Sequence, residues 1–427
     1  MTNKLVDDCF AHDRKRLRHA EALAILKQRI TPVANLENVG LADAAGRIMG
    51  SSIAAPFDVP AHTNAAVDGY SFAASDCNAD SGGQLPLAGR AAAGQRMAQR
   101  PPPSTAARIF TGAVMPDGHD TVVMQEDVGL TAAADGRKLV TIPGGLKRGA
   151  NVRNAGEDVK TGEVLLDAGA ALRPQDLAAI ASIGLNEIRC FARLRVAILS
   201  TGDELVRGDR DLTLGQVHDA NAPMLKALVA SAGAIPFDLG VLPDRLDVVK
   251  TRLVEAAAKH DVIITSGGAS RGEEDHLVAA LDAIGKRHLW QLAIKPGRPM
   301  SFGQAGNSVV LGLPGNPVAV FVCFLLYVWP LLRRLGGGAW PEPERYHLPA
   351  LLAFPGRKVG RREFWRGILK ETPRGLAVDK FARDGSGLIS GLRAADGLID
   401  IPEDVPEVRP GDKVAFIPFT AFGIARR

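Results

Sequence analysis

The chain of 427 residues has a formal net charge of +4, is 46% hydrophobic and 23% charged, and is long enough for several globular domains. Its near balance of charge argues against a protein that coats nucleic acid, and an aromatic content of 5% argues against base stacking as the main function. The four cysteines, Cys9, Cys77, Cys190 and Cys323, form no CxxC pair, so we expect neither a zinc–thiolate site nor a disulfide framework, and we expect a cytoplasmic protein.

The first part of the chain changes from helical to β-rich sequence. Residues 19–26 have helical spacing of apolar residues. From about 51 to 154 Pro and Gly become frequent, and Thr121–Met124 and Lys138–Ile142 predict short strands of a β-rich module. Residues 171–184 then predict a helix, because Pro174 lies near its start and Gly184 just past its end.

Residues 194–338 alternate strands with helices, which is typical of a parallel sheet with helices on both faces. The predicted strands are Val196–Ser200, Phe237–Leu242, Val262–Thr265 and Val309–Leu313, and the predicted helices cover 222–232, 245–258, 274–284 and 317–332. The apolar run 318–332 is shorter than the roughly 20 residues of a membrane span. It predicts a buried helix and no membrane association. Gly336, Gly337 and Gly338 indicate a linker to a final segment of short strands.

Three of the predicted strands end in unusual turns, which are Thr201–Glu204, Ser266–Ser270 and Pro314–Pro317. The carboxyl ends of parallel strands share one edge of a sheet, and open α/β sheets bind ligands there. Gly267 and Gly268 let backbone N–H groups approach a ligand, and the hydroxyls of Ser266 and Ser270 add donors. Each turn alone is equally compatible with an ordinary strand-to-helix connection, whereas two at one edge favour a phosphate site. The P-loop and the GxGxxG fingerprint are absent, which argues against a simple nucleotide hydrolase and a nicotinamide dehydrogenase.

Charged side chains follow the same strands. The acids are Asp203, Glu204, Asp244 and Asp275. Beside a phosphate cradle they fit Mg²⁺, which binds one or two carboxylates together with phosphate oxygens, although acids at helix starts also act as simple caps. Lys295 and Arg298 flank a rigid Pro-Gly turn, which favours oxyanion binding over a solvated turn.

Taken together, these stretches resemble the motifs of the molybdopterin molybdenumtransferase family, the MoeA-like proteins that include the E domain of gephyrin. The matching stretches are Asn64–Tyr70, Thr111–Pro116, Gly156–Asp158, Thr201–Leu205, Asp219–Asn221, Ser266–Asp275, Lys295–Pro299 and Leu313–Pro317. They extend over nearly the whole chain in order, and the ordered set is far more specific than any one stretch.

The resemblance implies a multi-domain α/β plus β fold. Its four domains are an elongated discontinuous domain (1–50 and 155–193), an inserted β-rich domain (51–154), a doubly wound, MogA-like α/β molybdopterin-binding domain (194–338) and a C-terminal β-barrel (339–427). It also implies a homodimer, in which each active site forms where the third domain of one subunit meets the first and second domains of the other.

The implied reaction is the final step of molybdenum cofactor synthesis. Mg²⁺-dependent cleavage of adenylylated molybdopterin releases AMP, and molybdate is inserted. The implied catalytic residues are Asp68, Asp158, Glu204, Asp244, Asp275, Lys295 and Arg298, of which Glu204, Asp244 and Asp275 face the metal. The implied substrate-binding residues are Thr201, Gly202, Asp203, Ser266, Gly267, Gly268, Ser270, Pro314, Gly315, Asn316 and Ser386. The implied partners are an upstream molybdopterin adenylyltransferase and downstream molybdoenzymes or their chaperones.

The sequence departs from the family pattern at three positions near the expected site. Ala65 replaces a serine, Arg298 replaces the second lysine of the Pro-Gly turn, and Arg271 replaces a small apolar residue. None of these changes removes a proposed acid. Two other functions are compatible with such a fold. A carrier of molybdopterin without catalysis predicts the loss of those acids, and a molybdopterin adenylyltransferase predicts the α/β module alone.

Overall fold

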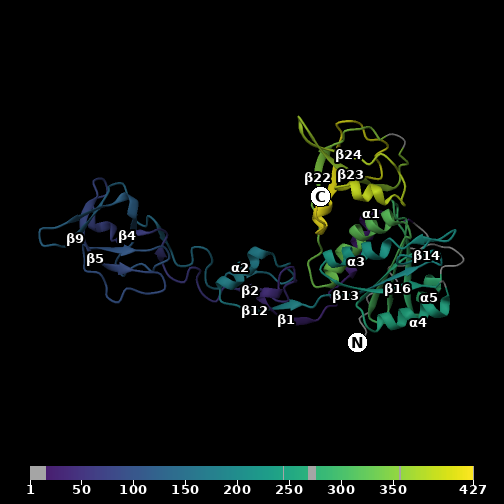
Figure 1. Cartoon of the computed structure of the whole chain (residues 1–427), viewed down its shortest axis with the longest axis horizontal. Helices are drawn as coiled ribbons and strands as arrows, with labels where there is room; N and C mark the ends of the chain where they lie inside the picture. The colour runs from purple at the N-terminus through teal and green to yellow at the C-terminus, as the bar shows by residue number, and fades with distance from the viewer. Residues whose placement is uncertain (1–15, 244, 268–275, 355–356, 427) are drawn as a thin grey trace.

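The computed structural model describes residues 16–243, 245–267, 276–354 and 357–426. The molecule is elongated (Figure 1), with a β-rich module at one end, a narrow region in the middle, and an α/β domain with a small C-terminal β domain at the other end. This is the multi-domain α/β plus β fold that the sequence predicts.

The α/β domain is built on a six-stranded sheet in the order β16-β13-β17-β21-β20-β18. The strands are β13 (Arg195–Thr201), β16 (Ile235–Leu242), β17 (Val262–Ser266), β18 (Gly285–Gln291), β20 (Pro299–Ala305) and β21 (Ser308–Leu313). The neighbouring strands β16, β13, β17 and β21 are parallel to one another. Beyond β21, the strands β20 and β18 pair antiparallel and form one edge of the sheet. All four predicted strands are confirmed within two residues.

Helices cover both faces of this sheet, because successive residues of a strand point to opposite sides. Val196 and Ile198 of β13 pack with α3 (Asn221–Ser231) and the last helices of the domain, α6 (Pro317–Cys323) and α7 (Trp329–Leu335). Ala197 and Leu199 pack instead with α4 (Leu246–Ala257) and α5 (His276–Ile284). A short parallel pair, β14 (Leu205–Val206) and β15 (Val217–His218), extends beside the sheet.

The apolar segment Pro317–Leu335 is one continuous helix in which a π-helical turn, Phe324–Val328, joins α6 to α7. Pro330 follows this turn at the start of α7, where a missing N–H is tolerated. By length and composition the segment could cross a membrane, but 89% of its apolar window is buried inside the protein. It is the central core helix of the α/β domain.

The narrow middle region has its own small core. It contains β1 (Leu36–Gly40) paired with β12 (Glu187–Phe191), β2 (Ile53–Ala54) paired with β11 (Val164–Leu166), and α2 (Pro174–Ser182). Here the observed packing differs from the predicted grouping of residues 1–50 with 155–193. Helix α1 (His19–Arg29) packs on the α/β domain, because Ala22, Leu26 and Ile30 form one apolar face that is buried in that core.

The inserted module contains a six-stranded sheet in the order β7-β4-β6-β5-β9-β8. Its strands are β4 (Gly69–Phe72), β5 (Gly83–Ala91), β6 (Ala106–Ile109), β7 (Thr121–Met124), β8 (Gly129–Ala132) and β9 (Lys138–Ile142). The strands predicted at 121–124 and 138–142 are confirmed. Two antiparallel segments, β3 (Asn64–Ala65) and β10 (Val152–Arg153), lead into and out of the module.

The C-terminal domain is a five-stranded barrel with α8 (Ile389–Ala394) at one side. Its strands are β22 (Tyr346–Pro349), β23 (Arg362–Thr372), β24 (Gly375–Lys380), β25 (Gly397–Ile401) and β26 (Lys413–Pro418). They pair in the order β22-β26-β25-β23-β24, and the N–H of Leu351, just past β22, donates to Val378 O of β24 at 3.0 Å, which closes the ring. From the α/β domain, β19 (Ile294–Lys295) pairs with β23, so the loop that carries Lys295 is part of the barrel sheet.

Candidate active site

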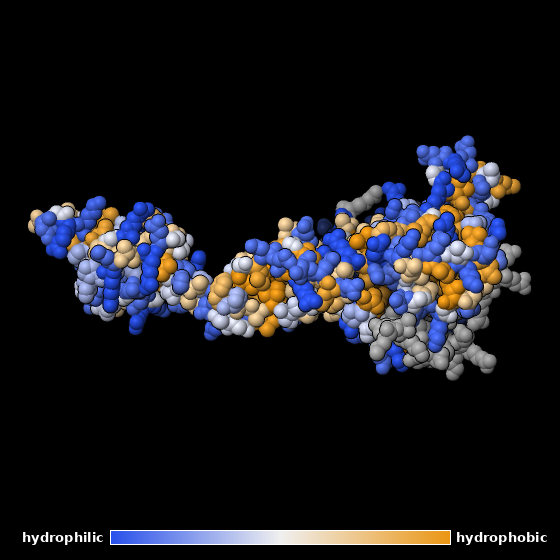
Figure 2. Space-filling model, turned by 90° about the horizontal axis from the view of Figure 1, so that it is seen from below, coloured by the Kyte–Doolittle hydropathy of each residue, from blue (hydrophilic) through white to orange (hydrophobic). Residues whose placement is uncertain are grey.

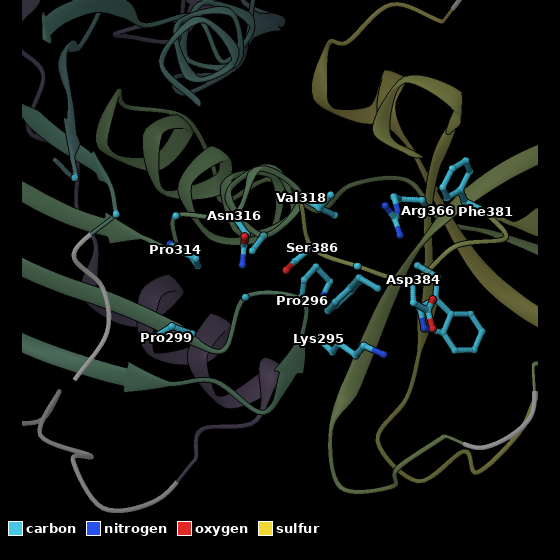
Figure 3. Close-up of a pocket in the computed structure, with 18 of the residues that line it drawn as sticks. Lys295, Pro296, Pro299, Pro314, Asn316, Val318, Arg366, Phe381, Asp384 and Ser386 are labelled. Atoms are coloured by element: carbon cyan, nitrogen blue, oxygen red, sulfur yellow. The ribbon is translucent and has the colours of Figure 1, made fainter. Parts of the chain in front are cut away.

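A cavity of about 750 Å³ lies where the α/β domain meets the C-terminal barrel. Its α/β side is formed by the ends of β13, β17 and β21, through Thr201, Gly267 and the segment 314–316. Its other side is formed by the barrel (Figure 3), where Arg366 and Asp384 face Pro314 and Asn316 across the cavity and Ser386 lies between them. The cavity therefore opens at the carboxyl edge of the parallel strands.

The turn after β17 is fixed by close backbone contact. Gly267 has a φ of +93°, and a Cβ there would lie 2.6 Å from Thr201 O, so only glycine fits. Its N–H donates to Leu313 O at 3.2 Å, which ties the turn to β21. At Gly202 a Cβ would lie 2.5 Å from Glu204 Oε2, so the carboxylate of Glu204 folds back over its own turn at the cavity.

Asn221, at the start of α3, holds two of these turns together. Its buried Nδ2 donates to Ser266 Oγ and to Gly315 O, both at 2.7 Å. Asp219 fixes the start of α3, because its Oδ1 accepts from the N–H groups of Asn221 and Ala222 at 3.1 Å. Hydrogen bonds from Ser200 and Arg207 to Asp219, and the positive charge of Arg207, lower the pKa of this carboxyl against the effect of its burial. The arrangement positions the Ser266 and Gly315 turns as one unit.

Asn316 and Pro317 begin the core helix as the sequence predicts. Asn316 is the N-cap residue of α6, but in the described part of the chain its side chain makes no capping hydrogen bond. It lies toward the centre of the cavity instead (Figure 3). Its amide is therefore available to a ligand.

Lys295 brings a weakly held positive charge to the cavity. Its Nζ lies 3.9 Å from Glu363 Oε2, and its side chain is 42% exposed. Glu363 is buried and already accepts stronger hydrogen bonds, from Trp365 Nε1 at 2.9 Å and from Arg361 Nε at 3.0 Å. Because Glu363 is satisfied by these groups, the ammonium of Lys295 can bind an anion in the cavity.

The barrel adds a second cation, Arg366. Its guanidinium donates to Leu388 O at 3.1 Å and to Arg383 O at 2.7 Å, and it stacks over the Phe381 ring at 5.0 Å. Nearby, Lys380 Nζ lies 2.6 Å from Asp384 Oδ1, and this hydrogen bond is the main cause of the lowered pKa of Asp384. Backbone contact also docks the barrel onto the core helix, because Val318 N–H donates to Ser386 O at 2.9 Å.

Asp68 and Asp158 lie far from this cavity in the same chain. Asp68 precedes β4 in the inserted module, at the opposite end of the molecule from the barrel (Figure 1). The backbone N–H and the hydroxyl of Thr111 both donate to Asp68 Oδ1 at 2.8 Å, and they lower the pKa of this exposed carboxyl. Asp158 is exposed on the connection between the module and the middle region.

Comparison with known proteins identifies the family. Three family models match successive parts of the chain: "MoeA N-terminal region (domain I and II)" over residues 17–184, "Probable molybdopterin binding domain" over 197–334, and "MoeA C-terminal region (domain IV)" over 350–419. The molybdopterin molybdenumtransferase of Haemophilus influenzae is 37% identical over 90% of this chain and 94% of that protein. The chain belongs to the MoeA family.

Other relatives also match most of this chain. Molybdopterin molybdenumtransferase 2 of Mycobacterium tuberculosis is 32% identical over 93% of this chain and 97% of that protein. Gephyrin of Dictyostelium discoideum is 30% identical over 78% of this chain and 51% of its own, longer chain. A crystal structure of the molybdopterin biosynthesis MoeA protein of Pyrococcus horikoshii superposes with a TM-score of 0.80 and 29% identity, covering 95% of this chain and 100% of that one.

Within this MoeA-family fold the predicted site residues other than Asp68 and Asp158 fall into three groups. Those that line the cavity are Thr201, Gly202, Glu204, Gly267, Lys295, Pro314, Gly315, Asn316 and Ser386. Asp203, Ser266 and Arg298 do not line it as far as the described residues define it: Asp203 and Arg298 are exposed nearby, and Ser266 is buried beneath the turn. Asp244, Gly268, Ser270 and Asp275, together with the departure at Arg271, lie outside the described residues.

Sequence reasoning missed two kinds of residue. Asn221 belongs to a matching motif, but its spacing from the other turns gives no sign that it bridges them. Trp365, Arg366 and Lys380 belong to the barrel strands β23 and β24, which come after the whole α/β domain in the chain, and only the docking of the barrel places them at the cavity. The signal that the sequence offered is a pair of charged residues, Glu363 and Arg366, flanking Phe364 and Trp365 in a strand, and both charged side chains are buried in the described structure.

Proposed function

We propose that this chain inserts molybdate into adenylylated molybdopterin and releases AMP. The observation that carries the proposal is the cavity itself, in which tight turns with phosphate-binding character face cations of the barrel. The support from comparison is that relatives 32–38% identical over most of their length are named molybdopterin molybdenumtransferase. Each part of the cavity has a task in such a reaction.

The α/β side suits the pterin phosphate. A ligand can approach the backbone closely at Gly267, which carries no side chain, and Asn316 adds a side-chain amide at the N-terminus of the core helix, whose positive end favours an anion. Lys295 and Arg366 face this side and would stabilise negative charge as the phosphoanhydride bond breaks and AMP leaves. The same two cations suit the doubly charged molybdate.

The oxygen donors at the cavity fit Mg²⁺. Glu204 offers a carboxylate and Thr201 a hydroxyl, and oxygen ligands are those that this ion prefers. No group of three His, Cys, Asp or Glu side chains with metal-site geometry occurs among the described residues. We propose that Glu204 holds the ion together with Asp244 and Asp275, which lie outside that set. The bound ion would neutralise phosphate charge during cleavage.

We further propose a homodimer that completes the site. Asp68 and Asp158 cannot reach the cavity of their own chain, because the elongated shape separates them from it (Figure 1). A second copy could supply them. Apolar surface gathers over the middle region and the adjoining body (Figure 2), where Leu36 is 39% and Val164 55% exposed. A cytoplasmic location, and exchange with an upstream adenylyltransferase and downstream molybdoenzymes or their chaperones, belong to the same proposal.

The test is AMP release from adenylylated molybdopterin with Mg²⁺ and molybdate. We expect molybdate-dependent release by the wild type and loss of at least tenfold in Lys295→Ala and in Asp275→Ala. Lys370→Ala is the matched control, because Lys370 is an exposed lysine on β23 away from the cavity. Tight binding of the substrate with no AMP release in any of these proteins would support a carrier. Formation of adenylylated molybdopterin from ATP would instead support an adenylyltransferase.

A further inference from the structure

Asp68 lies at one edge of the sheet in the inserted module, at the far end of the molecule from the cavity (Figure 1). Strand β4 runs antiparallel to β6 and β7, and β5 runs parallel to β6. The residues just before β4 therefore meet the last residues of β5, β6 and β7 at this edge. The polar and aromatic residues gathered there are Asp68, Arg90, Arg108, Phe110, Thr111, Gln125 and Glu126. The proposed reaction uses only Asp68 among them.

Arg108 is held between aromatic rings at this edge. Tyr70, Arg108 and Arg90 lie side by side on three neighbouring strands, because Arg108 is the register partner of both other residues. The guanidinium of Arg108 lies 5.0 Å from the centre of the Tyr70 ring and 4.8 Å from that of the Phe110 ring. Contact with two rings restricts the direction in which this guanidinium can donate hydrogen bonds.

The donors of Arg108 act on the backbone around Asp68. Its Nη1 donates to Gly69 O at 3.0 Å, and its Nη2 donates to Gln125 Oε1. The N–H of Gln125 donates in turn to Asp68 O at 3.1 Å. The carbonyl groups on both sides of the Asp68–Gly69 bond are therefore fixed, one by Arg108 and the other by the residue that Arg108 holds. This backbone places the Asp68 carboxylate where Thr111 donates two hydrogen bonds to it.

The positive charge of Arg108 also acts on two carboxylates at this edge. A hydrogen bond from Gln125 lowers the pKa of Glu126, the negative charge of Asp68 opposes this effect, and the charge of Arg108 adds to it. For Asp68 the hydrogen bonds from Thr111 are the main cause of the lowered pKa, and Arg108 contributes as well. In the described part of the chain Arg108 contacts backbone, amide and rings, and not the acids themselves. It acts on Asp68 through the backbone and through its charge.

We propose that Arg108 is a positioning residue, which holds Asp68 in the geometry with which it completes the cavity of a second subunit. This assignment rests on the proposed function, in which Asp68 belongs to the active site. Arg90 offers a matched comparison, because it is an exposed cation at the same edge and stacks over the same Phe110 ring at 4.7 Å. Among the described residues Arg90 forms no hydrogen bond or ion pair. It therefore has the charge of Arg108 without its hold on the backbone around Asp68.

The kinetics of AMP release by the full chain test the role of Arg108 in the reaction. Methionine keeps the unbranched apolar stem that packs between the rings and removes the charge and the donors. We expect Arg108→Met to lower kcat by about tenfold or more with little change in KM, because Asp68 moves while the cavity that binds the substrate is untouched. Arg90→Met should match the wild type. Wild-type kcat in Arg108→Met, or an equal loss in both variants, would overturn the assignment.

Co-expression shows whether the loss in Arg108→Met is local to Asp68. The Arg108→Met chain should regain AMP release when it is paired with Lys295→Ala, because it keeps an intact cavity and receives an intact module. It should stay inactive when it is paired with Asp68→Asn, because both changes then affect the module. Restoration by Lys295→Ala also shows that the Arg108→Met chain folds. If Lys295→Ala restores Asp68→Asn but not Arg108→Met, the loss is not local and the assignment is overturned.

Carboxyl labelling measures the state of Asp68 without any reaction. Carbodiimide activates a carboxyl group most readily when the group is protonated and free of hydrogen bonds, and mass spectrometry measures the label at each residue. Asp58 is an internal reference, because the N–H and the hydroxyl of Thr161 donate to its Oδ1 at 2.8 and 2.7 Å. Thr111 makes the same pair of hydrogen bonds to Asp68. The ratio of label at Asp68 to label at Asp58 therefore isolates a change at the module edge.

We expect this ratio to rise by about threefold or more in Arg108→Met, because the carboxylate of Asp68 loses both its fixed hydrogen bonds and a nearby positive charge. The ratio should stay at the wild-type value in Arg90→Met. An unchanged ratio in Arg108→Met would overturn the assignment even in an active enzyme. A raised ratio would support the hold of Arg108 on Asp68 even if the wild type releases no AMP. The positioning role and the proposed reaction can therefore fail separately.

Discussion

Asn221 joins two turns of the main cavity, because its single side-chain amide donates to both Ser266 Oγ and Gly315 O. It does not line the cavity itself as far as the described residues define it, so we regard it as a positioning residue. Its own orientation depends on Asp219, which holds the first turn of α3. The relative position of the Ser266 and Gly315 turns thus depends on a residue that lies beneath the surface of the cavity.

We expect Asn221→Ala to lower the free energy of unfolding by about 1–3 kcal/mol, because it removes two buried hydrogen bonds and leaves Gly315 O without this donor. Since the turns lose their common anchor, AMP release should fall as well. Thermal melting and the AMP-release assay measure the two effects. Asn186→Ala, at an exposed position, should match the wild type in both. Wild-type melting and turnover in Asn221→Ala would show that the turns hold their positions without it.

Gly267 offers a second test at the same scale. In Gly267→Ala the new Cβ would meet Thr201 O at 2.6 Å on a backbone with φ of +93°, so the turn must move and we expect a loss of about 1–3 kcal/mol of stability. Gly315→Ala is the matched control, because a Cβ at Gly315 meets no described atom within 4 Å. Denaturant unfolding of the two variants should separate them clearly. Equal stability would contradict the close approach of β13 and β17 at this turn.

At the scale of elements, helix α1 links the α/β domain to the barrel through His19. Nδ1 of this buried imidazole forms a hydrogen bond with Tyr327 Oη at 2.8 Å. The imidazole ring also packs edge-on against the rings of Tyr327 and of Phe364 in the barrel. Burial lowers its pKa to about 4, against the opposing effect of Asp400, and Arg362 and Arg345 lower it further. His19 is therefore neutral in the folded protein at neutral pH.

The lowered pKa of His19 predicts a loss of stability in acid. Below the unfolded pKa of about 6.5 the unfolded chain binds a proton that the folded chain does not, so the folded state loses up to about 3 kcal/mol between pH 6.5 and pH 4. Denaturant unfolding as a function of pH measures this slope. His19→Gln should have a shallower slope over that range, whereas His62→Gln, at an exposed histidine, should keep the wild-type slope. Identical slopes in His19→Gln and the wild type would refute the assignment.

The elements also show how far the sequence could predict the fold. The strands β13, β16, β17 and β21 were predictable because buried parallel strands are short apolar runs between helices. The apolar stripe of α1 predicts a helix, but a stripe identifies which face is buried and not which domain covers it, so its place on the α/β domain could not be derived. Trp365, Arg366 and Lys380 of the barrel were missed for a related reason, since docking between domains depends on contacts that no local pattern encodes.

At the scale of the whole molecule, the separation of Asp68 from the cavity makes the proposed dimer testable by complementation. If the inserted module of each subunit completes the cavity of the other, each active site takes Asp68 from one chain and Lys295 from the other. Asp68→Asn and Lys295→Ala then inactivate a site through different chains. In a mixed dimer the Asp68→Asn chain keeps an intact cavity, and the Lys295→Ala chain supplies it with an intact module. One of the two sites is then whole, as the two-fold symmetry of a homodimer requires.

Co-expression of the two variants should therefore restore AMP release. Random pairing gives about half mixed dimers with one good site each, which corresponds to about a quarter of the wild-type rate. Purification through two different tags would raise the rate of AMP release to about half of the wild-type rate, because every purified dimer then contains one chain of each variant. Lys295→Ala paired with Asn316→Ala is the matched control: both changes lie at the cavity, so neither chain offers a whole one and activity should stay low. Doubly tagged Asp68→Asn/Lys295→Ala dimers that stay as inactive as the control would exclude a site shared between subunits.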